Sequence, residues 1–206
     1  MTQTQWVYVV DDDESVRLAI EDLLASVGLA VQGFASVHSF LQHSRPAVPS
    51  CLLLDVRMPG QSGMDFHRQM QELGIALPVI FMTGHGDIEM GVQAMKQGAV
   101  DFFTKPFRDH DVLEAIYQAL EHDAIRLKQE HEHDQLVQRW QSLTVAEQYV
   151  LRQVVAGLLN KQIAAELGLS EITVKVRRAS AMRKLNLNHI VDLVQFMHAL
   201  DNEAKP

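Results

Sequence analysis

The run Cys51-Leu52-Leu53-Leu54-Asp55-Val56-Arg57-Met58-Pro59-Gly60 decides the fold of this chain. Its apolar part does not alternate with polar residues, which is typical of a parallel strand that is covered on both faces. Met58-Pro59-Gly60 then ends the strand and turns the chain. Asp55 directly follows the apolar part. The sequence therefore predicts a carboxylate at the point where a buried strand reaches the edge of its sheet.

Further strands and helices alternate on both sides of this run. Apolar runs predict strands, and amphipathic segments between them predict helices. The expected strands cover residues 6–10, 29–34, 51–54, 78–83 and 100–104, and the expected helices cover 15–27, 36–41, 64–73, 87–97 and a segment that begins near 109. Five β/α repeats of this length predict an α/β doubly wound five-stranded parallel sheet, which binds ligands at the carboxyl ends of its strands.

Five polar residues come at the ends of these strands. They are Asp11 and Asp12 after the first strand, Asp55 after the third, Thr83 at the end of the fourth and Lys105 after the fifth. Three carboxylates in one crevice repel each other unless a cation lies among them, and hard oxygen ligands favour Mg²⁺. In such a site Asp55 can act as a nucleophile towards a phosphoryl donor. Thr83 and Lys105 can stabilise the charge of the transferred group.

Composition and charge predict a globular chain with two electrostatically different parts. With 206 residues, 47% hydrophobic and 21% charged, two compact units are expected and a disordered chain is excluded. The net charge is −8, yet residues 160–185 hold six basic and two acidic residues. This change of sign predicts an acidic site in front and a polyanion contact behind. The first residues show no signal peptide and no membrane span follows, so we expect a cytoplasmic protein.

The second unit has the pattern of an all-α four-helix domain with a helix-turn-helix. Thr144 and Glu147 form a capping box for its first helix, which runs to about residue 156. A second helix covers 160–167, Gly168-Leu169 is a tight turn, and Ser170 caps a third helix at 171–185. The last helix is expected at 190–200, with its inward residues being Ile190, Leu193, Val194 and Met197.

The basic third helix is the candidate DNA-reading element. Val174 and Ala181 can fill the core, whereas Val176 lies two places from Val174 and faces away from it. An outward valine is explained if it meets a thymine methyl, and Lys175 suits a guanine or a phosphate. The remaining residues expected on DNA, mostly at phosphates, are Lys161, Thr173, Arg177 and Arg178. The alternative is a basic solvated helix in a protein-binding bundle.

The segment that joins the units is expected to be helical. Residues 109–156 contain no proline and no glycine, and apolar residues keep helical spacing past residue 120. We therefore predict that the helix beginning near 109 continues to about Leu136. His131 and His133 within it point to different sides of a helix, which favours a solvated charged face over a metal site. The expected domains are 1–122, a helical linker at 123–140, and 141–206.

Four motifs of the first unit resemble the receiver domain of bacterial two-component response regulators, a flavodoxin-like fold. They are Val9-Val10-Asp11-Asp12-Asp13, Leu54-Asp55-Val56-Arg57-Met58-Pro59-Gly60-Gln61-Ser62-Gly63, Met82-Thr83-Gly84-His85 and Thr104-Lys105-Pro106-Phe107. The resemblance covers about residues 5–121. It implies that Asp55 is the phosphoacceptor, that Asp11, Asp12 and the Arg57 carbonyl support Mg²⁺, and that Lys105 precedes a cis Pro106. It also implies that Thr83 and Phe102 move together as a switch.

The second unit resembles the LuxR-type DNA-binding domain of the FixJ/NarL class of regulators over about residues 140–200. The matching segments are Leu143-Thr144, Gly157, Asn160-Lys161-Gln162-Ile163-Ala164, Leu169-Ser170, Thr173-Val174-Lys175-Val176 and Met182-Arg183-Lys184-Leu185. Two positions depart from the class. Arg177 stands where histidine is common, and Leu159 stands where a small polar residue is usual.

Together these resemblances imply a response regulator that acts as a transcription factor. A cognate sensor histidine kinase would phosphorylate Asp55, the receiver would form a homodimer on phosphorylation, and the helix-turn-helix would bind double-stranded DNA. The receiver would catalyse only its own phosphorylation and dephosphorylation. The alternative is a free-standing phosphotransferase or phosphatase. Such enzymes commonly carry a second acid two places after the nucleophile, where this chain has Arg57. A protein-binding module with a degenerate site is disfavoured, because no site residue is missing.

Three further residues of the first unit invite hypotheses. Arg57 and His85 each lie two places after a site residue, and in the geometry that the receiver resemblance implies their side chains flank the path of water to an acyl phosphate; the alternative is that both are plain surface residues. We hypothesise that they set its rate of hydrolysis. Gly91 should destabilise the helix expected at 87–97 by about 1 kcal/mol relative to alanine. It either leaves this helix ready to shift or allows close packing.

Overall fold

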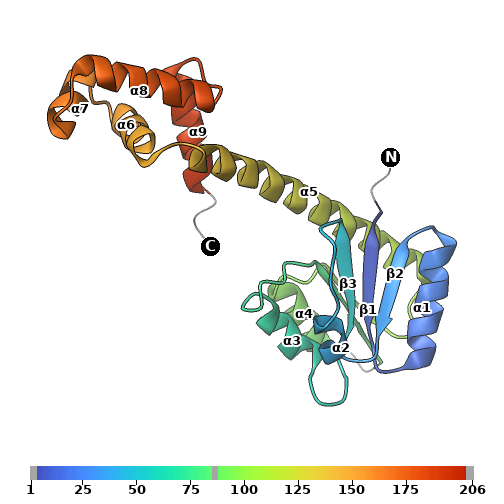
Figure 1. Cartoon of the computed structure of the whole chain (residues 1–206). Coiled ribbons are helices and arrows are strands. Elements are labelled where there is room, and N and C mark those ends of the chain that lie inside the picture. The colour runs from blue at the N-terminus through green and yellow to red at the C-terminus, as the bar shows by residue number, and fades with distance from the viewer. Residues whose placement is uncertain (1–3, 85–87, 203–206) are drawn as a thin grey trace. The chain divides into compact units, whose positions relative to one another are not determined.

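The computed structural model describes residues 4–84 and 88–202. The chain divides into two compact units, Met1–Lys128 and Gln129–Pro206. Figure 1 shows a sheet with flanking helices in the first unit and helices in the second. None of the helices in the described residues is long and apolar enough to cross a membrane.

The first unit contains the predicted five-stranded parallel sheet. Its strands are β1 (Trp6–Val10), β2 (Ala30–Phe34), β3 (Ser50–Asp55), β4 (Val79–Thr83) and β5 (Asp101–Thr104). They lie in the order β2-β1-β3-β4-β5, and all four pairings are parallel. Every residue of β3 is buried, which explains why its apolar run does not alternate. The expected doubly wound sheet is thus confirmed, with β3 at its centre.

In the part of the chain that the structure describes, five helices belong to or begin in this unit. They are α1 (Glu14–Ser26), α2 (Val37–Leu41), α3 (Gly63–Met70), α4 (Ile88–Lys96) and α5 (Asp109–Gln141). One core packs residues of α1 and α5, such as Ile20 and Ile116, on one face of the sheet. A second core packs Phe40 of α2 and Phe66 of α3 on the other face. Helix α3 ends at Met70, three residues before the predicted end at Leu73.

The second unit is helical, with α6 (Val145–Val155), α7 (Asn160–Leu167), α8 (Glu171–Lys184) and α9 (Ile190–Asn202). The predicted capping box of Thr144 and Glu147 is present, and the Ser170 side chain caps α8 by accepting the N–H of Thr173. Gly168 closes α7 with φ +64°, a left-handed conformation that glycine adopts without strain. This places the expected tight turn between α7 and α8.

The predicted inward face of α9 was wrong. Ile190 and Val194 of α9 are each 45% exposed, whereas Leu193, Phe196 and Met197 are buried in the core. The inward row of the helix therefore starts at Leu193 and continues three and four residues later. Apolar residues on both sides of α9 made the inward face ambiguous in the sequence.

Helix α5 continues beyond the predicted end at Leu136 and ends at Gln141. Its last turn carries Trp140, which is buried in the core of the second unit together with Leu143. Burial of this tryptophan side chain stabilises the final turn of α5. The polar residues before it do not provide such stabilisation. The continuous helix through the expected linker is therefore present.

Candidate functional site

Three carboxylates gather at one edge of the sheet. Asp11 and Asp55 are buried and Asp12 is exposed, and one oxygen of each lies within 4.8 Å of the other two. The register of the sheet causes this, because Val10 of β1 pairs with Leu54 of β3. The next residue of each strand is an aspartate, so both carboxylates reach the same edge.

Lys105 supplies the positive charge of this pocket. Its Nζ forms an ion pair with Asp11 Oδ2 and lies 3.4 Å from Asp55 Oδ1. The backbone N–H of Lys105 donates to the carbonyl of Thr83 at 2.8 Å, which extends the pairing of β4 and β5 by one residue. The peptide bond between Lys105 and Pro106 is cis, as the resemblance implied.

The charges around Asp55 favour the binding of a cation. Burial raises the pKa of this carboxyl above its usual value, Lys105 opposes that shift, and the charge of Asp11 adds to it. Apart from the ion-pair contact with Lys105, the buried Asp55 Oδ1 has no hydrogen-bond partner. Three carboxylates face one ammonium group, and their hard oxygens are the ligands that Mg²⁺ prefers. The donor set therefore fits Mg²⁺.

The four acids after β1 have different roles. Asp13 caps α1, because its side chain accepts the N–H groups of Ser15 and Val16. Asp11 Oδ1 accepts the N–H of Asp13 at 3.0 Å, which holds the Asp11 carboxylate in place. The sequence analysis assigned Asp11 and Asp12 to the pocket, but it did not predict that Asp13 caps α1.

The other predicted pocket residues differ in how they are placed. Thr83 is fully buried at the end of β4, the strand next to that of Asp55. Phe102 of β5 is partly buried and packs on α4, where a Cβ at Gly91 would lie 3.4 Å from its ring. A methyl group at this position would be in ordinary van der Waals contact with the ring, so close packing does not require the glycine. Arg57 is exposed, and His85 lies outside the described residues.

A buried aspartate that the sequence did not single out ties α5 to β3. Asp123 Oδ2 accepts the backbone N–H of Ser50 at 2.8 Å, and its Oδ1 accepts the Nε–H of Arg126 at 2.8 Å. Ser50 begins the strand that ends at Asp55. No local pattern predicts this contact, because the two residues are 73 positions apart.

The basic helix α8 presents most of its predicted DNA-binding residues to solvent. Lys175 and Val176 are exposed, as is Lys161 of α7, while Arg177 and Arg178 are partly exposed. Thr173 is partly buried, and its hydroxyl lies 2.8 Å from the Ser170 hydroxyl within the cap of α8. Val174 and Ala181 are buried as predicted. The side of α8 that carries Lys175 and Val176 therefore faces away from the core.

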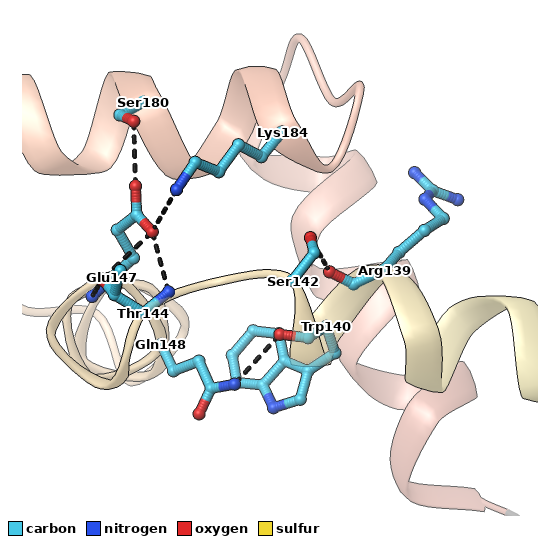
Figure 2. A network of polar contacts seen from close by, with 8 residues as sticks. All are labelled: Arg139, Trp140, Ser142, Thr144, Glu147, Gln148, Ser180 and Lys184. Atoms are coloured by element: carbon cyan, nitrogen blue, oxygen red, sulfur yellow. Dashed lines mark hydrogen bonds and ion pairs between the residues drawn. The ribbon is translucent and has the colours of Figure 1, made fainter.

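Figure 2 shows that Glu147 joins α6 to α8. Beyond its predicted bonds to Thr144, the buried carboxylate accepts hydrogen bonds from Ser180 Oγ and Lys184 Nζ, both at 2.8 Å. The bond from Lys184 is the main cause that lowers the pKa of Glu147 to about 2, assisted by the Thr144 backbone. Sequence reasoning found the cap but missed these partners, which lie 33 and 37 residues away.

The end of α5 is fastened to the same unit. Gln148 Nε2 donates to the carbonyl of Trp140 at 2.9 Å (Figure 2), and the same carbonyl also accepts the backbone N–H of Leu143 at 3.2 Å. Arg139 donates to the carbonyl of Leu185 at the end of α8, and its guanidinium carbon lies 5.2 Å from the ring centroid of Phe196. The last turn of α5 thereby contacts α6, α8 and α9.

Comparison with known proteins identifies the class that this fold and pocket define. A model of the response regulator receiver domain matches residues 7–117, and a model of the luxR family of bacterial regulatory proteins matches residues 141–197. Both resemblances inferred from the motifs are thereby confirmed. The chain belongs to the response regulators that combine a receiver domain with a LuxR-type DNA-binding domain.

Individual relatives match over nearly the whole chain. Nodulation protein W of Bradyrhizobium diazoefficiens is 47% identical, over 96% of this chain and 87% of the relative. Transcriptional regulatory protein FixJ of Rhizobium meliloti is 41% identical, over 92% and 93%. The solved structure of response regulator StyR is 46% identical, covers 95% of this chain and 98% of its own, and superposes with a TM-score of 0.83. Of these relatives, FixJ carries the name of a transcriptional regulatory protein.

Proposed function

We propose that this response regulator is a transcription factor controlled by phosphorylation of Asp55. The observation that carries the proposal is the state of Asp55, a buried carboxylate with a raised pKa and one oxygen without a hydrogen-bond partner. A carboxylate oxygen of Asp55 lies within 4.8 Å of one of Asp11, and Asp55 Oδ1 lies 3.4 Å from the ammonium nitrogen of Lys105. Such a group is poised to act when a cation neutralises the pocket.

A sensor histidine kinase is the proposed phosphoryl donor. A carboxylate oxygen of Asp55 attacks the phosphorus atom, the bond from phosphorus to the histidine nitrogen breaks, and an acyl phosphate forms on Asp55. Lys105 then pairs with the phosphoryl oxygens, and the hydroxyl of Thr83 donates to another of them. Asp11, Asp12, Asp55 and the Arg57 carbonyl would hold Mg²⁺, which supplies charge neutralisation when it is bound. We infer no catalysis beyond phosphorylation and dephosphorylation of the receiver itself.

The response is proposed to travel from the pocket to the DNA-binding unit. Thr83 and Phe102 reposition together, and the face formed by α4 and β5 then favours a homodimer. Two copies of α8 address paired half-sites in double-stranded DNA, and dimerisation raises the affinity through effective concentration. A family of DNA-binding regulators also supports action in the cytoplasm.

The proposed domain limits follow the elements. The receiver covers 1–122, the helical linker 123–140, and the DNA-binding domain 141–206. The two matched regions, 7–117 and 141–197, fall inside the outer domains. The linker is part of α5, whose end at Trp140 is buried in the second unit.

DNA contacts are assigned from exposure and charge. Val176 is proposed to meet a thymine methyl and Lys175 a guanine or a phosphate, because both side chains are exposed on α8. The proposed contacts mainly to phosphates are Lys161, Thr173, Arg177 and Arg178. The Thr173 hydroxyl already interacts with Ser170, so a phosphate would share it with the cap.

The site of phosphorylation can be tested by mass spectrometry. The full chain is incubated with acetyl phosphate and Mg²⁺, and its intact mass and the modified peptide are measured. We expect one phosphoryl group on the peptide that contains Asp55, and none on the Asp55→Ala variant. Asp65→Asn, a half-exposed aspartate on α3, is the matched control and should be phosphorylated like the wild type. Equal masses with and without the donor would contradict the proposal.

The lifetime of the acyl phosphate is proposed to depend on Arg57 and His85. The exposed Arg57 follows Asp55 by two places, where its side chain can flank the approach of water. We expect the double variant Arg57→Ala with His85→Ala to change the phosphorylated lifetime severalfold. An unchanged lifetime, measured by loss of the phosphorylated mass over time, would remove this role.

A further inference from the structure

An aliphatic row runs along the exposed side of α8. Ile172 is 76% exposed and Val176 is 62% exposed, and the exposed Ala179 follows three residues later. Positions i, i+4 and i+7 lie on one face of a helix. Val174 and Ala181 fill the core from the other side, so Ile172 has no packing role within its own unit.

Polar contacts of α8 with α6, together with the cap at its start, hold the row in this orientation. Ser180 and Lys184 both donate to the buried carboxylate of Glu147 (Figure 2). Ser170 caps the start of the helix through the N–H of Thr173. Rotation of α8 that would bury Ile172 would break these bonds. The exposure of Ile172 is therefore a fixed property of the domain.

We propose that Ile172 is a specificity-determining residue that contacts the methyl group of a second thymine, beside the one assigned to Val176. This inference rests on the proposed DNA readout. An aliphatic side chain cannot form hydrogen bonds with a base edge, and the thymine methyl is the apolar group that the major groove offers. The rise from Ile172 to Val176 is about 6 Å. With about 3.4 Å between base pairs, the two thymines should lie one or two base pairs apart.

The charges around the row favour DNA as its occupant. Lys175 and Arg177 flank Val176 in the sequence, Arg178 follows them, and Lys161 lies on α7, which suits a polyanion. The side chain of Ile172 carries no charge and no hydrogen-bonding group, so it suits a base edge and not a phosphate.

The test is selection of binding sites from a random duplex library by the full chain after treatment with acetyl phosphate and Mg²⁺. Wild type, Ile172→Ala and Ile172→Val are compared, and Val145→Ala is the matched control, since Val145 is an exposed aliphatic residue on α6. Each thymine of the wild-type site is then replaced by deoxyuridine, which removes only the methyl group. Thermal unfolding verifies that the variants fold.

We expect two thymines in each half-site at which deoxyuridine weakens wild-type binding, each about fourfold, the effect of losing one buried methyl group. At one of the two, the replacement should have no effect on Ile172→Ala and a smaller effect on Ile172→Val, while Val145→Ala behaves like the wild type at both. Unchanged base preference and unchanged deoxyuridine sensitivity in Ile172→Ala would overturn this inference and leave the proposed function standing. So would a change confined to the affinity of the unphosphorylated chain, which would indicate a protein contact at Ile172. Failure of the wild type to select any sequence would overturn the proposed function with it.

Discussion

At the scale of single residues, Asp55 is under opposing electrostatic influences. Burial and the neighbouring Asp11 raise the pKa of its carboxyl, whereas Lys105 lowers it. The ionised form needed for metal binding and for nucleophilic attack is therefore disfavoured in the folded chain without a cation. Binding of Mg²⁺ and ionisation of Asp55 should be coupled.

Replacing Asp55 by asparagine tests this coupling. Because the folded-state pKa is raised, the ionised carboxylate lowers stability at pH values above it, and this penalty disappears below the ordinary pKa. We expect Asp55→Asn to be more stable than the wild type at pH 7 without Mg²⁺. With Mg²⁺ at a hundred times its Kd, the wild type should gain about 2.7 kcal/mol and the variant less. Urea unfolding between pH 4 and 8 measures both effects, and a less stable metal-free variant would argue against the coupling.

The sequence predicts those pocket residues that lie at the ends of strands, because the positions of the strand ends place them. An aspartate after β1 and another at the end of β3 meet because parallel strands in register bring them to the same edge. The contact between Asp123 and Ser50 was not predictable, because no local signal links a helix residue to a strand 73 positions earlier. Short-range rules therefore located the site, and long-range polar contacts required the structure.

At the scale of elements, α6 and α8 are joined through one carboxylate. The capping box was evident from Thr144 and Glu147, but the bonds to Ser180 and Lys184 depend on how the helices pack. For the same reason, the inward face of α9 was predicted wrongly, with Ile190 and Val194 exposed. Periodicity predicts that a helix has an apolar face, and packing decides which of two candidate faces is buried.

Loss of the Glu147 charge should destabilise the DNA-binding unit. The pKa of Glu147 is lowered from 4.5 to about 2, so its stabilisation is present above pH 4.5 and is lost as the pH falls towards 2. We expect Glu147→Gln to lose about 3 kcal/mol at pH 7 and little at pH 2. Hydrogen exchange of the amides of α6 and α8 measures this free energy. Glu166→Gln, at an exposed position of α7, is the control, and equal protection in both variants would contradict the prediction.

The contact between α4 and β5 gives a second prediction at this scale. Adding a methyl group at Gly91 places it 3.4 Å from the Phe102 ring, which is ordinary van der Waals contact. We expect Gly91→Ala to stabilise the receiver by about 1 kcal/mol through helix propensity. The added contact should also restrict the proposed movement of Phe102 and weaken the response to phosphorylation. Native-state hydrogen exchange of the amides of β4 and β5 tests the first effect, and lower protection than in the wild type would refute it.

At the scale of the whole molecule, α5 contributes to both units. Asp123 binds Ser50 in the first unit, and Trp140 is buried in the core of the second. The sequence predicted a helical connection from the lack of proline and glycine, but its end at Gln141 depends on the burial of Trp140. In the sequence, the continuous helix α5 therefore connects the unit with the acidic pocket to the unit with the basic helix α8.

The affinity of the full chain for DNA, measured before and after treatment with acetyl phosphate and Mg²⁺, tests phosphorylation control most directly. The wild type is compared with Asp55→Asn and with the control Asp65→Asn on a duplex selected by the phosphorylated protein. We predict at least about tenfold tighter binding after treatment for the wild type and the control, since dimerisation adds effective concentration. Asp55→Asn should show no change. Equal affinity of the wild type in both states, or the same increase in Asp55→Asn, would contradict the account.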